Sequence, residues 1–248
     1  MPRTRQTPRP ATDAIEPQPH AARAARQRAV TDVRRALVLA AAKSAFLELG
    51  LDGASLREIA KRAGYTPGAI YSYFSSKEEV YAALLGESLE RLHACVAAAE
   101  PAPDAVLASG RSVAARRRQA ELTLRAKATA FFEFYRESPR DLDLGFYLFH
   151  GMQPRGLTPA LNEQLNTQLR GALLPTQQAL EALGWPAEEA QTEVTAWFAQ
   201  AVGLLLLSHT GRIRMFGQQS QALFERYLDG LIARAPRRSR HPGAARCP

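Results

Sequence analysis

The sequence is poor in cysteine and has no long apolar run. Cys95 and Cys247 are the only cysteines among 248 residues, so a disulfide framework is not expected and a reducing compartment suits the chain. The longest runs of apolar residues and glycine, 36–42 and 201–207, are far shorter than the ~20 residues of a membrane-spanning helix. The first ten residues, MPRTRQTPRP, lack the apolar segment of a secretory signal. We therefore expect a cytoplasmic protein that does not enter a membrane.

Patterns typical of enzymes are also missing. The five histidines, at positions 20, 93, 150, 209 and 241, are scattered, and no H-E-x-x-H pair occurs. The sequence contains neither a glycine-rich phosphate loop nor a nucleophile elbow. We therefore predict no catalytic residue, no metal site and no cofactor. An all-helical enzyme and a basic-tailed module that binds other proteins are the alternatives to a nucleic-acid-binding protein.

The formal net charge of +8 is concentrated at the two ends of the chain. Residues 1–30 contain six arginines against Asp13 and Glu16, and residues 234–248 contain five arginines and no acidic residue. Basicity of this kind indicates attraction to polyanions without identifying a folded recognition surface. The prolines and the lack of periodicity predict a disordered basic arm over 1–30 and a disordered basic tail over 236–248. The arm either contacts DNA or serves only solubility.

Between these ends the sequence predicts an all-α fold, because helix-forming residues dominate and no run alternates Val, Ile and Thr. The first helix is expected over about 31–49, with Leu37 and Leu49 in its apolar stripe and Gly50 as its cap. The segment 101–104, Pro-Ala-Pro-Asp, separates an N-terminal domain (31–93) from a C-terminal domain (104–235). Further helices are expected at 56–63, 66–74, 75–99, 113–137, 141–150, 159–183, 187–209 and 217–234, with a kink or break at Pro175.

The two short helices at 56–63 and 66–74 have the lengths and spacing of a helix-turn-helix. Ser55 followed by Glu58 is a capping-box pattern, and Thr66-Pro67 is a capping hydroxyl followed by proline at the first helical position. A left-handed Gly64 is expected in the turn, where a residue with a side chain would cost about 1 kcal/mol or more. The apolar faces of both helices should pack against Phe46 and Leu49; they comprise Leu56, Ile59, Ala60, Ala63, Ile70 and Phe74.

The remaining residues of the second short helix are small or able to hydrogen-bond, and few of them could anchor a core. A helix that lies in the major groove of DNA needs small residues at its N-terminus and hydroxyl groups near bases and phosphates. The alternative is that the tyrosines cover the small core with their rings. Lys77, in the first turn of the next helix, is either a phosphate contact or an exposed lysine offset by Glu78 and Glu79. The residues of this polar face are Thr66, Pro67, Gly68, Ala69, Tyr71, Ser72 and Tyr73.

The stretch 54–81, ASLREIAKRAGYTPGAIYSYFSSKEEVY, closely resembles the DNA-binding segment of the tetracycline-repressor (TetR) family. With the preceding helix the resemblance covers about residues 32–93. It implies an all-helical homodimer with an N-terminal helix-turn-helix domain, joined by a fourth helix to a ligand-binding bundle. It also implies that Thr66, Pro67, Gly68, Tyr71 and Ser72 face the groove, and that Ser55, Tyr73 and Lys77 hold phosphates. Ser72 departs from the bulkier or basic residue of many members, so the preferred bases stay open.

The C-terminal half offers weaker signals. Aromatic helical faces are more often core than pocket, but aromatic walls with a few polar groups are also what a small-molecule effector site requires. Leu204–Leu207 cover every side of a helix, so that segment should be buried all round. Burial by the last two helices of a partner chain is our prediction, with an internal core as the alternative. The candidate effector contacts are Phe131, Tyr135, Tyr147, His150 and Trp197.

Overall fold

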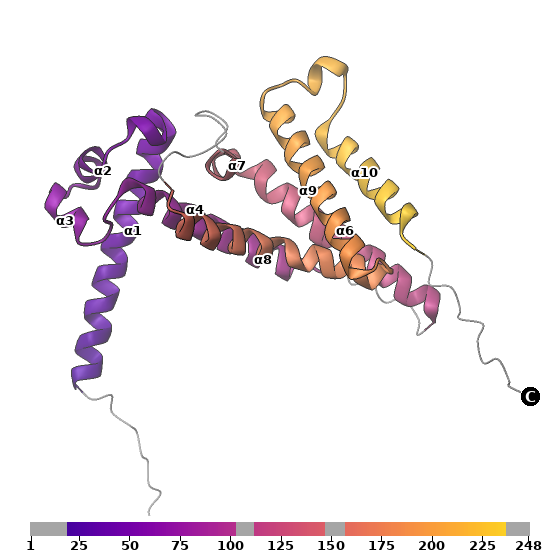
Figure 1. Cartoon of the computed structure of the whole chain (residues 1–248), viewed down its shortest axis with the longest axis horizontal. Helices are drawn as coiled ribbons and strands as arrows, with labels where there is room; N and C mark the ends of the chain where they lie inside the picture. Colours follow the sequence, from indigo (N-terminus) through magenta and orange to yellow (C-terminus); the bar gives the residue numbers. More distant parts are fainter. Residues whose placement is uncertain (1–18, 103–111, 147–156, 237–248) are drawn as a thin grey trace, which may run out of the picture.

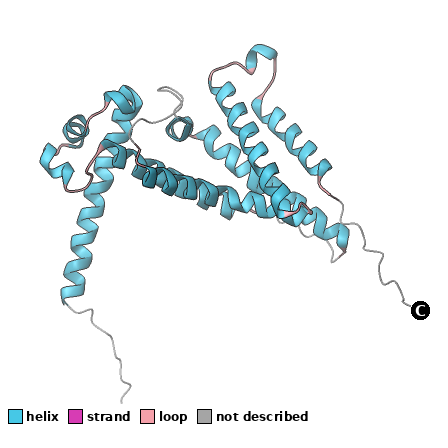
Figure 2. Ribbon diagram, viewed as in Figure 1, coloured by secondary structure: helices cyan, strands magenta, loops and turns pink. Residues whose placement is uncertain are grey.

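The computed structural model describes residues 19–102, 112–146 and 157–236, and within them it contains helices and no strand (Figures 1 and 2). This confirms the all-α prediction. Three helices form one end of the molecule, α4 leads away from them, and the other helices form a bundle at the far end (Figure 1). The helices are α1 (Pro19–Gly53), α2 (Leu56–Ala63), α3 (Pro67–Tyr71), α4 (Lys77–Ala98), α6 (Val113–Glu137), α7 (Pro139–Phe146), α8 (Pro159–Leu183), α9 (Ala187–His209), η1 (Arg214–Phe216) and α10 (Ser220–Arg234).

Helix α1 begins twelve residues before its expected start at about Thr31, so the predicted disordered arm is wrong for residues 19–30. All five prolines of the first thirty residues lie at or before Pro19, and the residues after it are rich in alanine and arginine, both strong helix formers. Proline is well tolerated in the first turn of a helix, where Pro19 stands. Residues 1–18 lie outside the described part of the chain, as do residues 237–248 of the predicted tail.

The buried face of α1 is turned slightly from the predicted one. Gly50 ends the regular helix with a φ of 71°, as expected of a cap. However, Leu37 and Leu49 are exposed, at 52% and 41%, and Leu51 beyond the cap is buried instead. Successive residues are rotated by about 100° around a helix, so neighbours of a correctly identified core residue can still point outward. The residues that α1 buries are Val38, Leu39, Ala42, Ala45 and Phe46.

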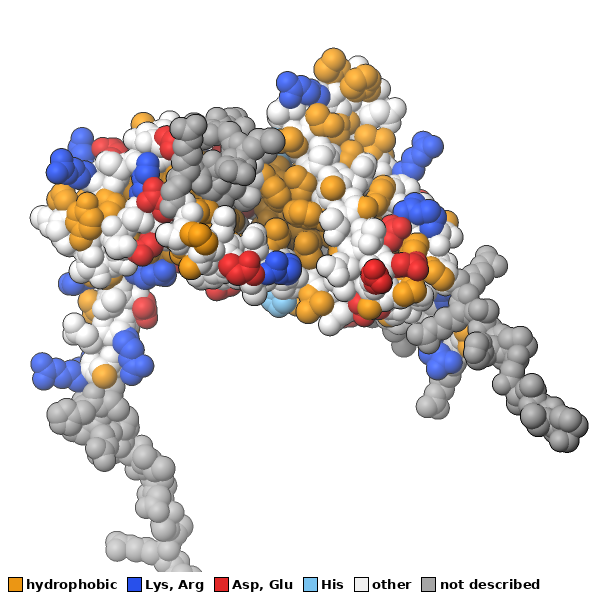
Figure 3. Space-filling model, in the orientation of Figure 1, with side chains coloured by type: hydrophobic (Ala, Val, Ile, Leu, Met, Phe, Trp, Pro, Cys, Tyr) orange, Lys and Arg blue, Asp and Glu red, His pale blue; other side chains and the backbone are white. Residues whose placement is uncertain are grey.

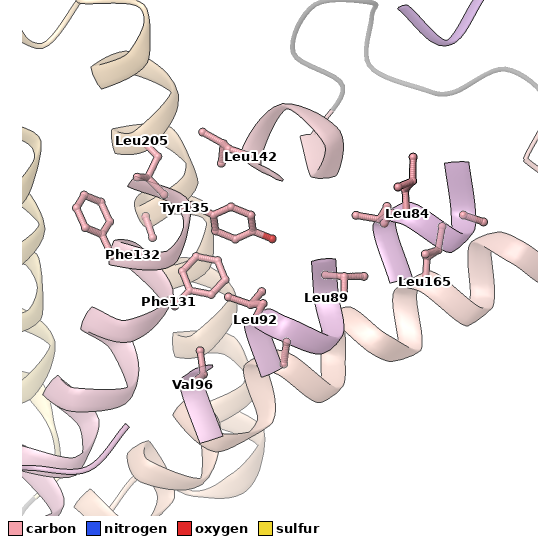
Figure 4. Close-up of a cluster of buried hydrophobic side chains, with 14 of the residues drawn as sticks. Leu84, Leu89, Leu92, Val96, Phe131, Phe132, Tyr135, Leu142, Leu165 and Leu205 are labelled. Atoms are coloured by element: carbon pink, nitrogen blue, oxygen red, sulfur yellow. The ribbon is translucent and has the colours of Figure 1, made fainter. Parts of the chain in front are cut away.

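Helix α4 connects the two ends of the molecule. Its first half packs against α1, and along its length it also contacts α6, α7 and α8. Figure 4 shows Leu89, Leu92 and Val96 of α4 beside Phe131 of α6 in the bundle core. One continuous helix therefore carries side chains of both cores.

The bundle departs from the sequence expectations at two places. Pro175 lies inside α8, which runs on from Pro159 to Leu183, so the helix is not split at this proline. The last helix starts at Ser220 and not at 217, because Gly217 takes a left-handed conformation with a φ of 64° after the short η1. Residues 147–150 of the predicted helix 141–150 lie outside the described residues. In the part that is described, no helix is long and apolar enough to cross a membrane.

Candidate functional site

The turn between α2 and α3 is built by three local capping interactions. The hydroxyl oxygen of Ser55 accepts a hydrogen bond from the N–H of Glu58 at 3.2 Å, and that of Thr66 accepts from the N–H of Ala69 at 3.3 Å. Between them Gly64 adopts the left-handed conformation, with a φ of 72°. Its backbone N–H reaches carbonyl oxygens of the last turn of α2, so the helix end is satisfied inside the turn. The predicted helix-turn-helix is therefore present.

A small apolar core fixes the angle between the two helices. Ile59, Ala60 and Ile70 are completely buried, and Phe74 and Phe46 are nearly so. The predicted contribution of Leu49 is absent for the reason given above. Since α3 has only five residues, its position depends on this core and on its caps more than on its own helical stability.

The outer face of α3 is open to solvent. Tyr71 is 57% exposed, and Thr66, Pro67, Gly68 and Ser72 are exposed as well. The Ser72 hydroxyl donates to the carbonyl of Ala69 at 2.7 Å, which leaves its oxygen able to accept another bond. Five of the seven predicted face residues thus form one accessible surface.

The other two members of that face, Ala69 and Tyr73, are half-buried. The Tyr73 ring packs against the core, so the alternative in which a tyrosine covers the core holds for Tyr73 and not for Tyr71. Ser55, at the start of α2, is exposed on the surface of the domain.

Lys77 has intramolecular partners that the sequence did not indicate. Its ammonium donates to the carbonyl oxygens of Leu51 at 2.8 Å and Asp52 at 3.4 Å, and thereby fastens the start of α4 to the end of α1. At the same helix start, the N–H of Ser75 donates to the Glu79 carboxylate at 2.8 Å and lowers the pKa of Glu79. An ammonium has three N–H donors, so the carbonyl contacts leave Lys77 with capacity for a further acceptor.

Several nearby cations are also held by acidic groups. Arg62 bonds to Glu58 at 2.8 Å and Glu48 at 2.9 Å, and this pairing raises the pKa of Arg62. The capping box is therefore incomplete, because the Glu58 side chain pairs with Arg62. Arg35 lies over the ring of Phe74, 5.2 Å from its centroid, and 3.8 Å from a carboxylate oxygen of α4. Of these contacts, only the Glu58–Arg62 pair could be predicted from the sequence, because its members are four residues apart on one helix.

A second candidate site lies in the bundle, where aromatic rings from α6, α7 and α9 meet. Phe131 and Tyr135 of α6 are 5.2 Å apart between ring centroids, and Trp197 of α9 lies 5.0 Å from Phe131. Phe198 makes an edge contact with Phe131, Phe146 makes one with Tyr135, and the rings of Phe146 and Phe198 lie 5.9 Å apart in a tilted contact. Figure 3 shows hydrophobic side chains gathered in a hollow near the middle of the visible face, and Figure 4 shows Phe131 and Tyr135 projecting from α6.

Two polar groups are buried within this aromatic cluster. Among the described residues, the Trp197 Nε1–H has no hydrogen-bond acceptor although its side chain is fully buried. Burial, together with the negative charge of Asp141, raises the pKa of the Tyr135 phenol. Three of the five predicted effector contacts are thus brought together; Tyr147 and His150 lie outside the described residues.

A cluster of polar and charged side chains around the buried Asp141 links the bundle to the three-helix end. Asp141, at the start of α7, is 6% exposed and accepts hydrogen bonds from Ser88 at 3.1 Å and Arg91 at 2.8 Å, both on α4. Lys43 of α1 lies 3.6 Å from the same oxygen. Lys43, Arg91 and Asp141 line part of a small pocket of about 180 Å³ between α1, α4 and α7. Close by, the Tyr81 hydroxyl on α4 donates to the carbonyl of Leu144 on α7.

No group of three or more metal-ligating side chains occurs within residues 19–102, 112–146 and 157–236. The features that are present are a capped helix-turn-helix with an open outer face and a bundle with an aromatic cluster. They define the chain as a helix-turn-helix protein with a helical accessory domain.

Part of the chain, including residues 38–84, is similar in sequence to known proteins. Residues 38–84 match the family described as "Bacterial regulatory proteins, tetR family". The HTH-type transcriptional activator FasR of Mycolicibacterium smegmatis is 41% identical over 61 residues, which cover 25% of this chain and 28% of that protein. The HTH-type transcriptional regulator TtgR of Pseudomonas putida is 42% identical over 72 residues, covering 29% of this chain and 34% of that protein. The match therefore spans about a third of the length of these relatives.

Likeness to solved structures extends further along the chain. A regulatory protein in the tetR family from Rhodococcus RHA1 shares the fold with a TM-score of 0.55, over 82% of this chain and 96% of that one, at 20% identity. At such an identity the likeness concerns the fold alone. Residues 38–84 thus match the tetR family of bacterial regulatory proteins. This match confirms the resemblance found in residues 54–81.

Proposed function

We propose that this protein is a ligand-responsive transcriptional repressor. It binds a palindromic operator in double-stranded DNA as a homodimer, and a small-molecule inducer releases it. The observation that carries the proposal is the outer face of α3, which presents Tyr71, Thr66 and Ser72 to solvent on a helix held rigidly by its caps and core. Repression requires only that the bound dimer occupies the DNA, whereas activation requires additional contacts with the transcription machinery.

The open face of α3 suits the major groove. Pro67, Gly68 and Ala69 bring little side-chain volume to the start of the helix, so the backbone can approach base edges closely. Tyr71 and Ser72 supply hydroxyl groups one turn further on. At the edges of this face, Ser55, Tyr73 and Lys77 are proposed to contact phosphates, which fix the register of the protein on the duplex. Two such helices in a dimer would read half-sites about 34–36 Å apart.

The aromatic cluster is proposed as the effector site. A buried indole N–H without a protein acceptor costs free energy, and a ligand that carries an acceptor would satisfy it. Phe131, Tyr135 and Trp197 then form the apolar wall, and Tyr147 and His150 are the predicted contacts from the segment that follows α7. The site lies beside α7, whose Asp141 is bound to α4 and α1, so a ligand that displaces α7 would also displace the α3 helices.

The homodimer is proposed to form through α9 and α10. Within one chain Leu204 and Leu205 are buried, but Leu207 is 41% exposed, so the leucine run is covered on only part of its circumference. The exposed side of α9 also carries Ala196 and Ala199, small residues over which a second helix can approach closely. Burial of this face requires a partner chain.

Binding measurements with two variants test the α3 interface. Duplexes that bind the wild-type protein are first selected from random DNA, and affinity is then measured by fluorescence anisotropy. Tyr71→Ala is expected to weaken binding to the selected sequence by about 10-fold or more and to leave random DNA nearly unaffected, because a base contact carries about 1–3 kcal/mol of discrimination. Equal losses on both DNAs would make Tyr71 a scaffold residue.

Lys77→Ala separates a phosphate contact from a purely structural role. Loss of a phosphate contact weakens binding to all sequences and reduces the slope of log K against log salt concentration by about one unit. Loss of the Leu51 contact alone would lower the melting temperature without changing that slope. A wild-type protein that shifts no duplex in the selection would refute the proposed function itself.

A further inference from the structure

The first part of α1 is a charged helix that stands clear of the rest of the molecule. All residues from Arg23 to Arg34 are exposed, and Figure 1 shows this segment projecting from the end that carries α2 and α3. Its helical state follows from its composition and from its continuity with the packed half of α1, which has already met the cost of nucleation. A helix of this kind holds its charges in a fixed arrangement.

The charge of the N-terminal domain is concentrated in this projection. Between residues 23 and 34 there are four arginines and one acidic residue, Asp32. From residue 35 to 93 there are seven basic and seven acidic residues, and Arg62 and Lys77 among the basic ones already contact acceptors within the domain. The α2–α3 region therefore supplies little of the positive charge that DNA binding normally requires.

The spacing of the arginines matches a duplex. Arg23, Arg26 and Arg34 are separated by three and eight residues, so they share one side of the helix. Arg23 and Arg34 are about 17 Å apart along the axis, the length of about five base pairs. The same side also carries exposed Val30, Val33 and Leu37, which add apolar surface between the charges.

We propose that the projecting helix, residues 19–34, is a second DNA contact that extends the footprint of the protein beyond the bases read by α3. The inference rests on the proposed function. The partner is the phosphate backbone of double-stranded DNA, contacted by Arg23, Arg26 and Arg34 without regard to sequence. The segment thereby supplies affinity and salt dependence, whereas α3 supplies selectivity.

The test compares two triple variants of the full-length protein. Arg23→Ala/Arg26→Ala/Arg34→Ala keeps the helix, because alanine is the best helix former. The control, Arg116→Ala/Arg118→Ala/Arg170→Ala, removes the same charge from exposed positions on α6 and α8. Affinity for a selected duplex and for random DNA is measured over a range of salt concentrations, with circular dichroism and sedimentation velocity on each variant.

The α1 variant is expected to bind both DNAs about tenfold or more weakly and to reduce the salt slope by about two to three units, at about 0.9 per phosphate. It should retain the ratio between selected and random DNA. Adding flanking base pairs to the selected duplex should strengthen binding of the wild type and the control, but not of the α1 variant.

Two results would overturn the inference while leaving the proposed function intact. One is a selected duplex that binds the α1 variant and the control with equal salt slopes. The other is an altered sedimentation coefficient of the α1 variant with an unchanged salt slope, since this helix would then bind a second copy of the chain. Absence of sequence-dependent binding by the wild type would instead refute the proposed function.

Discussion

At the scale of single residues, Asp141 connects more parts of the molecule than its sequence context indicates. One carboxylate, nearly buried, joins Ser88 and Arg91 of α4 to Lys43 of α1. Asp141→Asn should lower the free energy of unfolding by about 1–2 kcal/mol, because a buried pair loses its charge while the partly exposed cations are screened by water. Urea unfolding followed by circular dichroism measures the change.

The exposed pair of Arg125 and Asp229 is the matched control for that prediction. Both side chains are largely in solvent, so Asp229→Asn is expected to change the free energy of unfolding by less than about 0.5 kcal/mol. If both variants behaved alike, burial of Asp141 would contribute nothing beyond a surface ion pair.

At the scale of elements, the two glycines around the helix-turn-helix should respond in opposite ways to alanine. A Cβ at Gly64 meets no atom within 4 Å, but the left-handed φ of 72° makes Gly64→Ala destabilising by about 1 kcal/mol. Gly68 also has open space around it and lies in α3, so Gly68→Ala should not lower stability. It should nevertheless weaken operator binding, because the added methyl group holds the backbone away from the bases. Thermal unfolding and anisotropy titrations on the same preparations check both expectations.

Local sequence patterns predicted the caps and the turn of these elements. Contacts between residues distant in the sequence could not be predicted. Caps at Ser55 and Thr66, and the turn at Gly64, depend on residues within four positions of each other and were readable in the sequence. The carbonyl partner of Lys77 lies 26 residues away, and the partners of Asp141 lie 50 to 98 residues away, so both sets of contacts required the folded chain. The start of α1 differs from the prediction because the prolines of residues 2–19 indicate disorder, whereas the alanine-rich stretch that follows them favours a helix.

At the scale of the whole molecule, the exposed side of α9 leads to a prediction about assembly. A Cβ at Gly203 contacts nothing within 4 Å in one chain, so Gly203→Arg should leave the monomer folded and even favour its helix by up to about 1 kcal/mol. In a dimer through α9 and α10 the arginine would hold the two chains apart. Sedimentation velocity should then detect monomers and a large loss of affinity for the palindromic duplex.

Gly171→Arg on α8 provides the comparison, since a Cβ there also meets open space. This variant should sediment as the wild type does. If the Gly203→Arg protein still forms dimers and binds the palindromic duplex with wild-type affinity, the subunit interface lies somewhere other than α9.

The length of the projecting part of α1 amplifies small rotations of the N-terminal domain into larger displacements of the tip of the helix. It continues without a break into the packed half of the helix, so any rotation of the N-terminal domain is carried to its tip. Over about 24 Å, the length of residues 19–34, a turn of about 10° sweeps that tip through about 4 Å, more than the rise of one base pair. A change at the bundle too small to dislodge α3 by itself would thus pull the arginines out of step with the phosphates.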